Sequence, residues 1–292
     1  MTQPVIAPDI TARKPRDDEI DVYGITHPGK VRKDNQDHFL ICSLRPGVVV
    51  HHTSLPDTGR WSGAERLAFL AMVADGVGGS AMGEEASRLA VAGITDYVTQ
   101  CVHTYYTADS SNDAGFADAL VEAAMQVHAR IVEQTRETDD PRGGSTTLTL
   151  WIGVWPRAYL LQVGDSRCYT LREGVLTQIS RDQTMAQELM DAGVLKRTEV
   201  RRTRWAHVLS SSIGGHQTAP VVTRMDQEWG RVGLLCSDGL TKHVSDERIA
   251  ERLRSMSSAK QVCEALLQDA LDDGGTDNIT ILVGRPVRKD LA

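Results

Sequence analysis

Five short acidic fragments constrain the fold of this chain more than any other feature of its sequence. Each carries an Asp beside turn-forming residues, and they lie far apart: Asn35-Gln36-Asp37, Asp75-Gly76-Val77-Gly78-Gly79, Gly164-Asp165-Ser166-Arg167, Ser237-Asp238-Gly239 and Thr276-Asp277-Asn278. A single Asp-Gly pair indicates only a turn. Five such fragments, too distant for one local loop, indicate a site that the fold assembles. Hard divalent cations such as Mg²⁺ and Mn²⁺ prefer the oxygen ligands that such a site offers.

The composition narrows the class of protein. The chain has 292 residues, of which 41% are hydrophobic, so it can form one large domain or two small ones. Its formal net charge of −7 argues against nucleic acid as the main partner, because phosphate backbones select basic surfaces. The five cysteines form no C-x-x-C pair, which argues against a thiolate zinc site and a disulfide framework and fits a reducing cytosol. No apolar run approaches the ~20 residues of a membrane span. We therefore expect a cytoplasmic monomer that binds neither nucleic acid nor membrane.

The chain reads as one domain. No Pro/Ser-rich linker and no internal repeat interrupts it. Residues 1–18 lack an apolar signal segment and are rich in Pro, Asp, Arg and Lys, which predicts a disordered leader. We expect a domain over residues 19–287 with a mobile flap near 182–217, a surface insertion over 43–65 and a short tail over 288–292.

Strands and helices are both predicted. Apolar residues recur at the three-to-four spacing of one helix face over 83–98 and 117–135. From Thr146 the period changes to two, and four short runs read as an antiparallel meander: 146–154, 158–163, 168–171 and 175–179. Further strands are expected at 20–26, 39–42, 68–73, 229–236 and 279–283, and further helices at 185–191, 246–256 and 259–271, the last two capped by Ser245 and Ser258.

Three aspartates sit at the ends of apolar strands. Asp75 and Asp238 each follow such a strand, and Asp277 precedes one. The Asp75 fragment alone is compatible with a plain turn or with a nucleotide-binding loop, but no Gly-Lys-Ser/Thr follows it and its glycines do not fit G-x-G-x-x-G. Three strand ends that each deliver one Asp are the arrangement that a two-metal oxygen site needs.

Arg32 lies just before the first acidic fragment. Its planar guanidinium matches phosphate oxygens. By itself it reads as a surface residue in a basic turn with Lys30 and Lys33. Beside a dinuclear metal site, a phosphate clamp becomes the better interpretation.

The ordered set of fragments resembles the metal-dependent protein phosphatases of the PPM family, the protein phosphatase 2C class, in their bacterial form. Each fragment alone is weak, but their order over roughly residues 20–285 is highly specific. The fragments that carry the resemblance are Val31-Arg32-Lys33-Asp34-Asn35-Gln36-Asp37, Val73-Ala74-Asp75-Gly76-Val77-Gly78-Gly79 with Gly83-Glu84, Gly144-Ser145-Thr146-Thr147, Val163-Gly164-Asp165-Ser166-Arg167, Ser237-Asp238-Gly239-Leu240 and Thr276-Asp277-Asn278-Ile279-Thr280.

The resemblance implies a fold and a ligand set. The fold is α+β, with two stacked, mostly antiparallel sheets flanked by helix pairs in an α-β-β-α sandwich. Two Mn²⁺ or Mg²⁺ ions are bridged by Asp75, with the carbonyl of Gly76 and the carboxylates of Asp238 and Asp277 as further ligands. Asp37 orders water around the second ion. Arg32 holds the phosphate of the substrate, whereas Asp165 and Ser166 belong to a structural turn and are not expected as ligands.

Several positions depart from the family pattern. Gln36 stands where many members have Glu, and Val77 stands where animal members carry a His proposed as general acid, which leaves water or a residue such as His38 for that role. Asp182-Gln183-Thr184 replaces the usual Asp-His-Thr/Ser, and residues 209–215 are looser than the usual end of the flap. Asp140 is the nearest candidate for the third metal that some bacterial members bind.

The implied activity is hydrolysis of phosphoserine and phosphothreonine in proteins that a Ser/Thr kinase has phosphorylated. A metal-activated hydroxide attacks phosphorus in line, without a phosphoenzyme. The basic run 196–204, in the flap of an acidic protein, points to substrate contact through Arg201 and Arg202. The sequence contains no C-x₅-R motif, which argues against a phosphatase with a cysteine nucleophile. Two alternatives stay open: a catalytically silent module of the same fold that senses a partner, and a nucleotide-binding protein.

Overall fold

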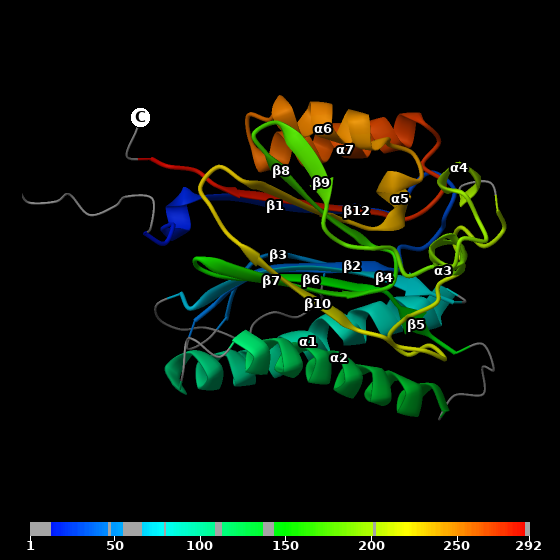
Figure 1. Cartoon of the computed structure of the whole chain (residues 1–292), viewed down its shortest axis with the longest axis horizontal. Helices are drawn as coiled ribbons and strands as arrows, with labels where there is room; N and C mark the ends of the chain where they lie inside the picture. Colours follow the sequence, from blue (N-terminus) through cyan, green and yellow to red (C-terminus); the bar gives the residue numbers. More distant parts are fainter. Residues whose placement is uncertain are drawn as a thin grey trace, which may run out of the picture.

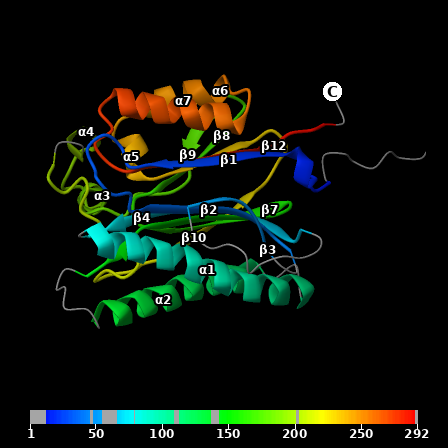
Figure 2. The ribbon, with the colours of Figure 1, turned by 180° about the vertical axis from the view of Figure 1, so that it is seen from behind.

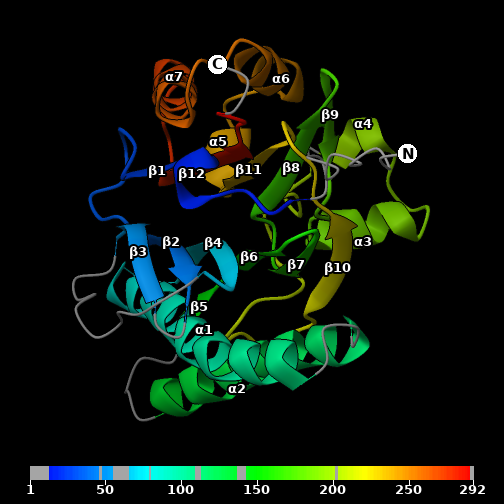
Figure 3. The ribbon, with the colours of Figure 1, turned by 90° about the vertical axis from the view of Figure 1, so that its left-hand side faces the viewer.

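The computed structural model describes residues 13–45, 48–54, 66–78, 80–108, 113–136, 143–200 and 203–289. Two antiparallel sheets stack face to face, and a pair of helices covers the outer face of each, so the predicted α-β-β-α sandwich is confirmed (Figure 1). The view from behind shows the same four layers, and the end-on view separates the two helix pairs clearly (Figures 2 and 3).

The first sheet has five strands in the order β1-β12-β11-β8-β9. Helices α6 and α7 cover it, and Ser245 and Ser258 cap them as predicted, each accepting a hydrogen bond from the backbone N–H three residues on. The elements of this half are β1 (Ile20–His27), β8 (Arg167–Arg172), β9 (Val175–Gln178), β11 (Val232–Cys236), α6 (Asp246–Arg254), α7 (Ala259–Asp272) and β12 (Ile279–Pro286).

The second sheet has seven strands in the order β10-β7-β6-β4-β2-β3, with the short β5 paired to β4. Helices α1 and α2 pack on it through apolar residues at helical spacing. Its elements are β2 (Asp37–Leu44), β3 (Val48–Thr53), β4 (Ala68–Val77), α1 (Ser80–Ala108), α2 (Asp113–Arg136), β5 (Ser145–Thr146), β6 (Leu148–Val154), β7 (Arg157–Val163) and β10 (Val221–Asp226). Short elements complete the chain: η1 (Asp17–Glu19), α3 (Met185–Asp191), α4 (Arg197–Val200) and α5 (Asp238–Thr241).

The core has three apolar layers. One lies beneath α1 and α2, one beneath α6 and α7, and a thinner one between the two sheets, with Phe39, Val73 and Leu282 among its members. An apolar cavity of about 130 Å³ also lies between the sheets, and residues such as Ala68, Trp151 and Gly284 line it. It is remote from the acidic fragments. Among the helices of the described residues, none is long and apolar enough to cross a membrane.

The predicted meander is wrong in one respect. Its four strands exist, but β6 and β7 pair in the seven-stranded sheet, whereas β8 and β9 pair in the five-stranded sheet. The chain changes sheet at Gly164-Asp165-Ser166, where Gly164 has a φ of +98°. Period-two patterns specify strands but not their partners, so this switch left no periodic signal.

Two further expectations need correction, and one strand was missed. Strand β3, an edge strand paired with β2 through a bulge, occupies part of the predicted surface insertion 43–65. Strand β10 was not predicted, because its residues are mostly exposed and show little apolar alternation. The end of the predicted leader contacts the domain: Arg13 donates hydrogen bonds of 2.7 and 2.6 Å to the two carboxylate oxygens of buried Glu19. Residues 1–12 lie outside the described residues.

Candidate metal and phosphate site

Strand ends bring the predicted aspartates together at one end of the sandwich. Asp37 in β2 and Asp75 in β4 are direct partners in the antiparallel register. Asp238 follows β11, and Asp277 lies two residues before β12, so both come from the other sheet. Asp75, Asp238 and Asp277 line a cleft of about 930 Å³, together with Arg32 and Asp165, whereas Asp37 is buried and does not line it. This end carries α3 and α5, at the right of Figure 1.

Asp37 lies beneath the cleft and is 2% exposed. One carboxylate oxygen, Oδ2, accepts hydrogen bonds from Ser237 Oγ (2.8 Å) and Thr280 Oγ1 (2.7 Å). The other, Oδ1, is buried and has no hydrogen-bond partner in the described part of the chain. Burial, together with the nearby charges of Asp238 and Asp277, raises the pKa of Asp37 to about 7. A buried carboxylate with a free oxygen favours binding of a cation or an ordered water.

Asp75 lies at the centre of the negative charge. Its pKa is well above the usual value, because of burial and then of the charges of four other aspartates: Asp37, Asp238, Asp165 and Asp277. Burial and the charge of Asp238 also raise the pKa of Asp165. Its fragment was among the five that predicted the site, but the resemblance implied that Asp165 belongs to a structural turn and is not a metal ligand. The structure places it in the wall of the cleft.

Two basic side chains, those of Lys242 and Arg32, form ion pairs with the aspartates of the cleft. Lys242 Nζ is 2.6 Å from Asp238 Oδ2 and 2.7 Å from Asp277 Oδ2. Arg32 Nε is 2.8 Å from Asp277 Oδ1. Burial would raise the pKa of Asp277, but the hydrogen bonds and charges of Lys242, and then of Arg32, outweigh it and lower that pKa. Arg32 therefore lies at the predicted site, where its guanidinium pairs with the carboxylate of Asp277.

Gly76 occupies a position that only glycine fits. A Cβ atom there would lie 2.3 Å from the carbonyl oxygen of Gly83 and 2.8 Å from that of Gln36. The start of α1 and the loop before β2 thus pack directly on the backbone of β4. This close approach requires glycine at position 76, and the predicted use of its carbonyl as a metal ligand stays a prediction.

The donor set fits hard divalent cations. Within the described ranges, no three His, Cys, Asp or Glu side chains converge tightly enough to form a ready metal cluster, and the ammonium of Lys242 lies between two of the candidate ligands. The candidate donors are nevertheless all oxygens, which hard divalent cations prefer. One of them, Asp37 Oδ1, is buried and has no hydrogen-bond partner in the described residues, and the negative charge of the carboxylates exceeds the positive charge of the neighbouring side chains. Asp140, Arg201 and Arg202 lie outside the described residues, so their predicted roles stay predictions.

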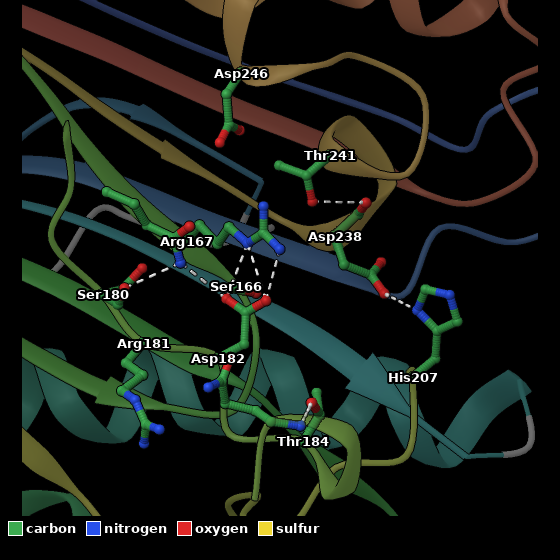
Figure 4. A network of polar contacts seen from close by, with 12 residues as sticks. Ser166, Arg167, Ser180, Arg181, Asp182, Thr184, His207, Asp238, Thr241 and Asp246 are labelled. Carbon is green, nitrogen blue, oxygen red and sulfur yellow. Dashed lines mark hydrogen bonds and ion pairs between the residues drawn. The ribbon is translucent and has the colours of Figure 1, made fainter. Parts of the chain in front are cut away.

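The expectation for His38 is wrong. Its side chain is buried, its Nδ1 lies 3.0 Å from Ser87 Oγ, and burial lowers its pKa to about 4. It is absent from the described residues that line the cleft. Sequence reasoning overlooked His207, which lines the cleft and points toward Asp238, with Nδ1 4.0 Å from Asp238 Oδ2 (Figure 4). Its position in the flap carried no motif that could have identified it.

A polar network holds the base of the predicted flap. Arg167 donates from Nε and Nη2 to both oxygens of Asp182, at 2.6 to 3.1 Å (Figure 4). Gln183 donates its backbone N–H to the Gly164 carbonyl (3.0 Å) and accepts from the Gly164 N–H through Oε1 (2.8 Å). The Asp182-Gln183-Thr184 fragment thus ties the flap to the sheet-switching turn, and residues 207–212 continue from there along the cleft.

Known proteins share this sequence and fold. A family model described as Protein phosphatase 2C matches residues 51–274. The serine/threonine protein phosphatase PstP of Mycobacterium tuberculosis is 35% identical over 231 residues, which cover 79% of this chain and 42% of that protein. This chain therefore spans less than half the length of that relative. The serine/threonine phosphatase stp of Listeria monocytogenes is 29% identical over 223 residues, covering 76% and 85% respectively.

Solved structures agree with these relatives. A crystal structure of M. tuberculosis PstP/Ppp superposes with a TM-score of 0.73 and 29% identity, covering 92% of this chain and 99% of that chain. A structure of the PstP catalytic domain in complex with two manganese ions gives a TM-score of 0.70 and 30% identity, with the same coverage.

Proposed function

This chain belongs to the protein phosphatase 2C family, and from that membership we propose that it is a metal-dependent phosphatase of phosphoserine and phosphothreonine proteins. The observation that carries the proposal is the convergence of Asp37, Asp75, Asp238 and Asp277 from both sheets on one cleft, with more negative charge than the protein itself compensates. The related PstP catalytic domain that holds two manganese ions supports Mn²⁺ and two ions.

In this proposal Asp75, the Gly76 carbonyl, Asp238 and Asp277 would hold the ions, and Asp37 would orient a water beside them. When bound, two divalent cations would supply a water of lowered pKa and would neutralise the phosphate oxygens in an in-line displacement. The Oδ2 of Asp37 is fixed by Ser237 and Thr280, so the buried Oδ1, which has no hydrogen-bond partner in the described part of the chain, keeps a constant direction. A preorganised acceptor of this kind costs no rearrangement during the reaction.

Arg32 and His207 serve the phosphate and the leaving group. The Arg32 side chain is 56% exposed at the cleft, so it can turn from Asp277 to the phosphate of a bound substrate. His207 is the imidazole nearest the acidic centre among the described cleft residues, and it gives a proton to the departing Ser or Thr oxygen. The cytoplasmic location, the monomeric state and the link to a Ser/Thr kinase are part of the proposal.

Hydrolysis of p-nitrophenyl phosphate and of a phosphothreonine peptide, with Mn²⁺, with Mg²⁺ or with EDTA, tests this function. We expect metal-dependent turnover that falls by at least about 10²-fold in Asp238→Asn, because a ligand is lost. Asp118→Asn, on an exposed position of α2, is the matched control and should keep full activity. Absence of turnover with folded, metal-bound protein would refute the proposal and favour the catalytically silent partner-binding module.

The role of His207 has its own test. His207→Gln should slow the phosphothreonine peptide by about 10²-fold, since general acid catalysis typically contributes that much. The same change should affect p-nitrophenyl phosphate far less, because its leaving group is a stable anion that needs no proton. An equal loss on both substrates would exclude His207 as the proton donor.

A further inference from the structure

The ammonium of Lys242 lies between two of the predicted metal ligands, Asp238 and Asp277. Lys242 is the C-cap residue of α5, whose first residue is Asp238, and its backbone N–H donates to the Asp238 carbonyl at 2.8 Å. A side chain four residues after Asp238 on a helical turn lies over it. The ammonium reaches further and joins Asp238 to Asp277, the two predicted ligands from the five-stranded sheet.

The charges explain why the ammonium sits there. Asp75 interacts unfavourably with four other carboxylates, and among the described residues Lys242 and Arg32 pair with members of this group. Lys242 is largely enclosed, with 22% of its side chain exposed, so its contacts are less screened than those of a surface lysine. Without it, Asp238 and Asp277 would repel each other across the cleft.

A divalent cation would need the same place. A metal bound by both Asp238 and Asp277 draws on carboxylate groups whose Oδ2 atoms already contact the ammonium. Like charges at about 4 Å repel strongly in a partly enclosed site, so the ammonium and the metal cannot both stay close to these oxygens.

We propose that Lys242 is an internal counter-ion, which occupies the position of one divalent cation in the metal-free protein and is displaced when that cation binds. It stabilises the metal-free sandwich and weakens metal binding. The lysine thus sets the metal concentration at which the enzyme becomes loaded. This inference rests on the proposed function only in assuming that divalent cations bind at this site.

Calorimetric titration of the full chain with Mn²⁺ tests the inference. Lys242→Met keeps the length of the side chain and removes the charge, so we expect at least tenfold tighter Mn²⁺ binding. Lys242→Arg keeps the charge and should bind within about threefold of the unmodified protein. Lys260→Met removes an exposed ammonium 3.8 Å from Glu264, far from the site in sequence, and should leave the affinity unchanged. Equal or weaker binding by Lys242→Met would overturn the proposal.

Thermal unfolding provides a second readout. In EDTA, Lys242→Met should melt below the unmodified protein, whereas with saturating Mn²⁺ the two should melt alike. If Lys242→Met does not fold in EDTA, Lys242→Gln, which can still donate hydrogen bonds, replaces it. Equal melting temperatures in EDTA would refute the counter-ion role. If Lys242→Met binds Mn²⁺ more tightly but the unmodified protein has no phosphatase activity, only the proposed function is refuted. If the unmodified protein is active but Lys242→Met binds Mn²⁺ with unchanged affinity, only this inference is refuted.

Discussion

The ion pair between Arg167 and Asp182 provides the sharpest test of how this fold supports its cleft. Arg167 begins β8 directly after the sheet-switching turn, and Asp182 is the first residue of the predicted flap 182–217. The two side chains are only 21% and 19% exposed, and Arg167 Nη1 also donates to Tyr169 Oη at 2.9 Å. Asp182→Asn should therefore leave an enclosed guanidinium without its counter-charge.

The expected cost follows from this enclosure. Breaking a fully buried ion pair costs about 3–5 kcal/mol, and an exposed pair contributes about 0–1 kcal/mol. For a pair that is one-fifth exposed, we expect the free energy of unfolding to fall by about 2–3 kcal/mol. At roughly 2–4 °C per kcal/mol for a domain of this size, the melting temperature should fall by about 4–12 °C.

Urea unfolding of the metal-free protein measures the effect. Glu85→Gln is the control, because Glu85 pairs with Arg88 at the same 2.6 Å but with side chains 47% and 38% exposed. It should cost less than about 1 kcal/mol. In the double variant Arg167→Met/Asp182→Asn, the loss should be smaller than the sum of the single losses, since each single change removes the same pair. The reasoning is refuted if Asp182→Asn costs no more than Glu85→Gln.

Three further predictions concern separate parts of the fold. Gly239→Ala should prevent stable folding or cost more than about 3 kcal/mol, because the new Cβ would lie 1.9 Å from the Asn278 carbonyl oxygen; circular dichroism and urea unfolding check this. The hydrogen bond from Arg13 lowers the pKa of Glu19 to about 2, so its contribution is complete above pH 4.5 and is lost as the pH falls toward 2. Glu19→Gln should therefore flatten the melting temperature against pH within that window, and an unchanged acid slope would contradict the assignment. Ser245→Ala should cost about 1 kcal/mol in urea unfolding, because the N-cap of α6 is lost, and no loss would show that the cap is unimportant.

The strands and helices of the core could be predicted because their apolar spacing is strong. Helices α6 and α7 appeared with their caps, since Ser245 and Ser258 each precede an amphipathic segment. Strand β10 could not be predicted, because an edge strand whose side chains are mostly exposed has no apolar alternation. The change of sheet at Gly164 could not be predicted either, because tertiary packing and not the local pattern decides which strands pair.

The residues of the candidate site also fall into those that the sequence could predict and those that it could not. Asp75, Asp238 and Asp277 could be predicted because acidic turns at strand ends are visible in a sequence. Lys242 and His207 could not, since one depends on a helical turn that returns over Asp238 and the other on how the flap lies across the cleft. His38 failed as a candidate because burial beside Ser87 cannot be read from its neighbours in the chain.

The site also explains how metal binding and folding are coupled. Asp37 and Asp75 come from the seven-stranded sheet, whereas Asp238 and Asp277 flank strands of the five-stranded sheet. Asp37 already joins the two through Ser237 and Thr280. Cations held by Asp75 from one sheet and by Asp238 and Asp277 beside the other would bind only the correctly stacked sandwich. They would therefore stabilise it by mass action, by about 2.7 kcal/mol when the free metal is at one hundred times its dissociation constant. Lys242 joins only Asp238 and Asp277, both beside the five-stranded sheet, so it does not supply this link between the sheets. The gain in stability on adding Mn²⁺ therefore contains the new link between the sheets, less the contacts of the ammonium that the metal displaces.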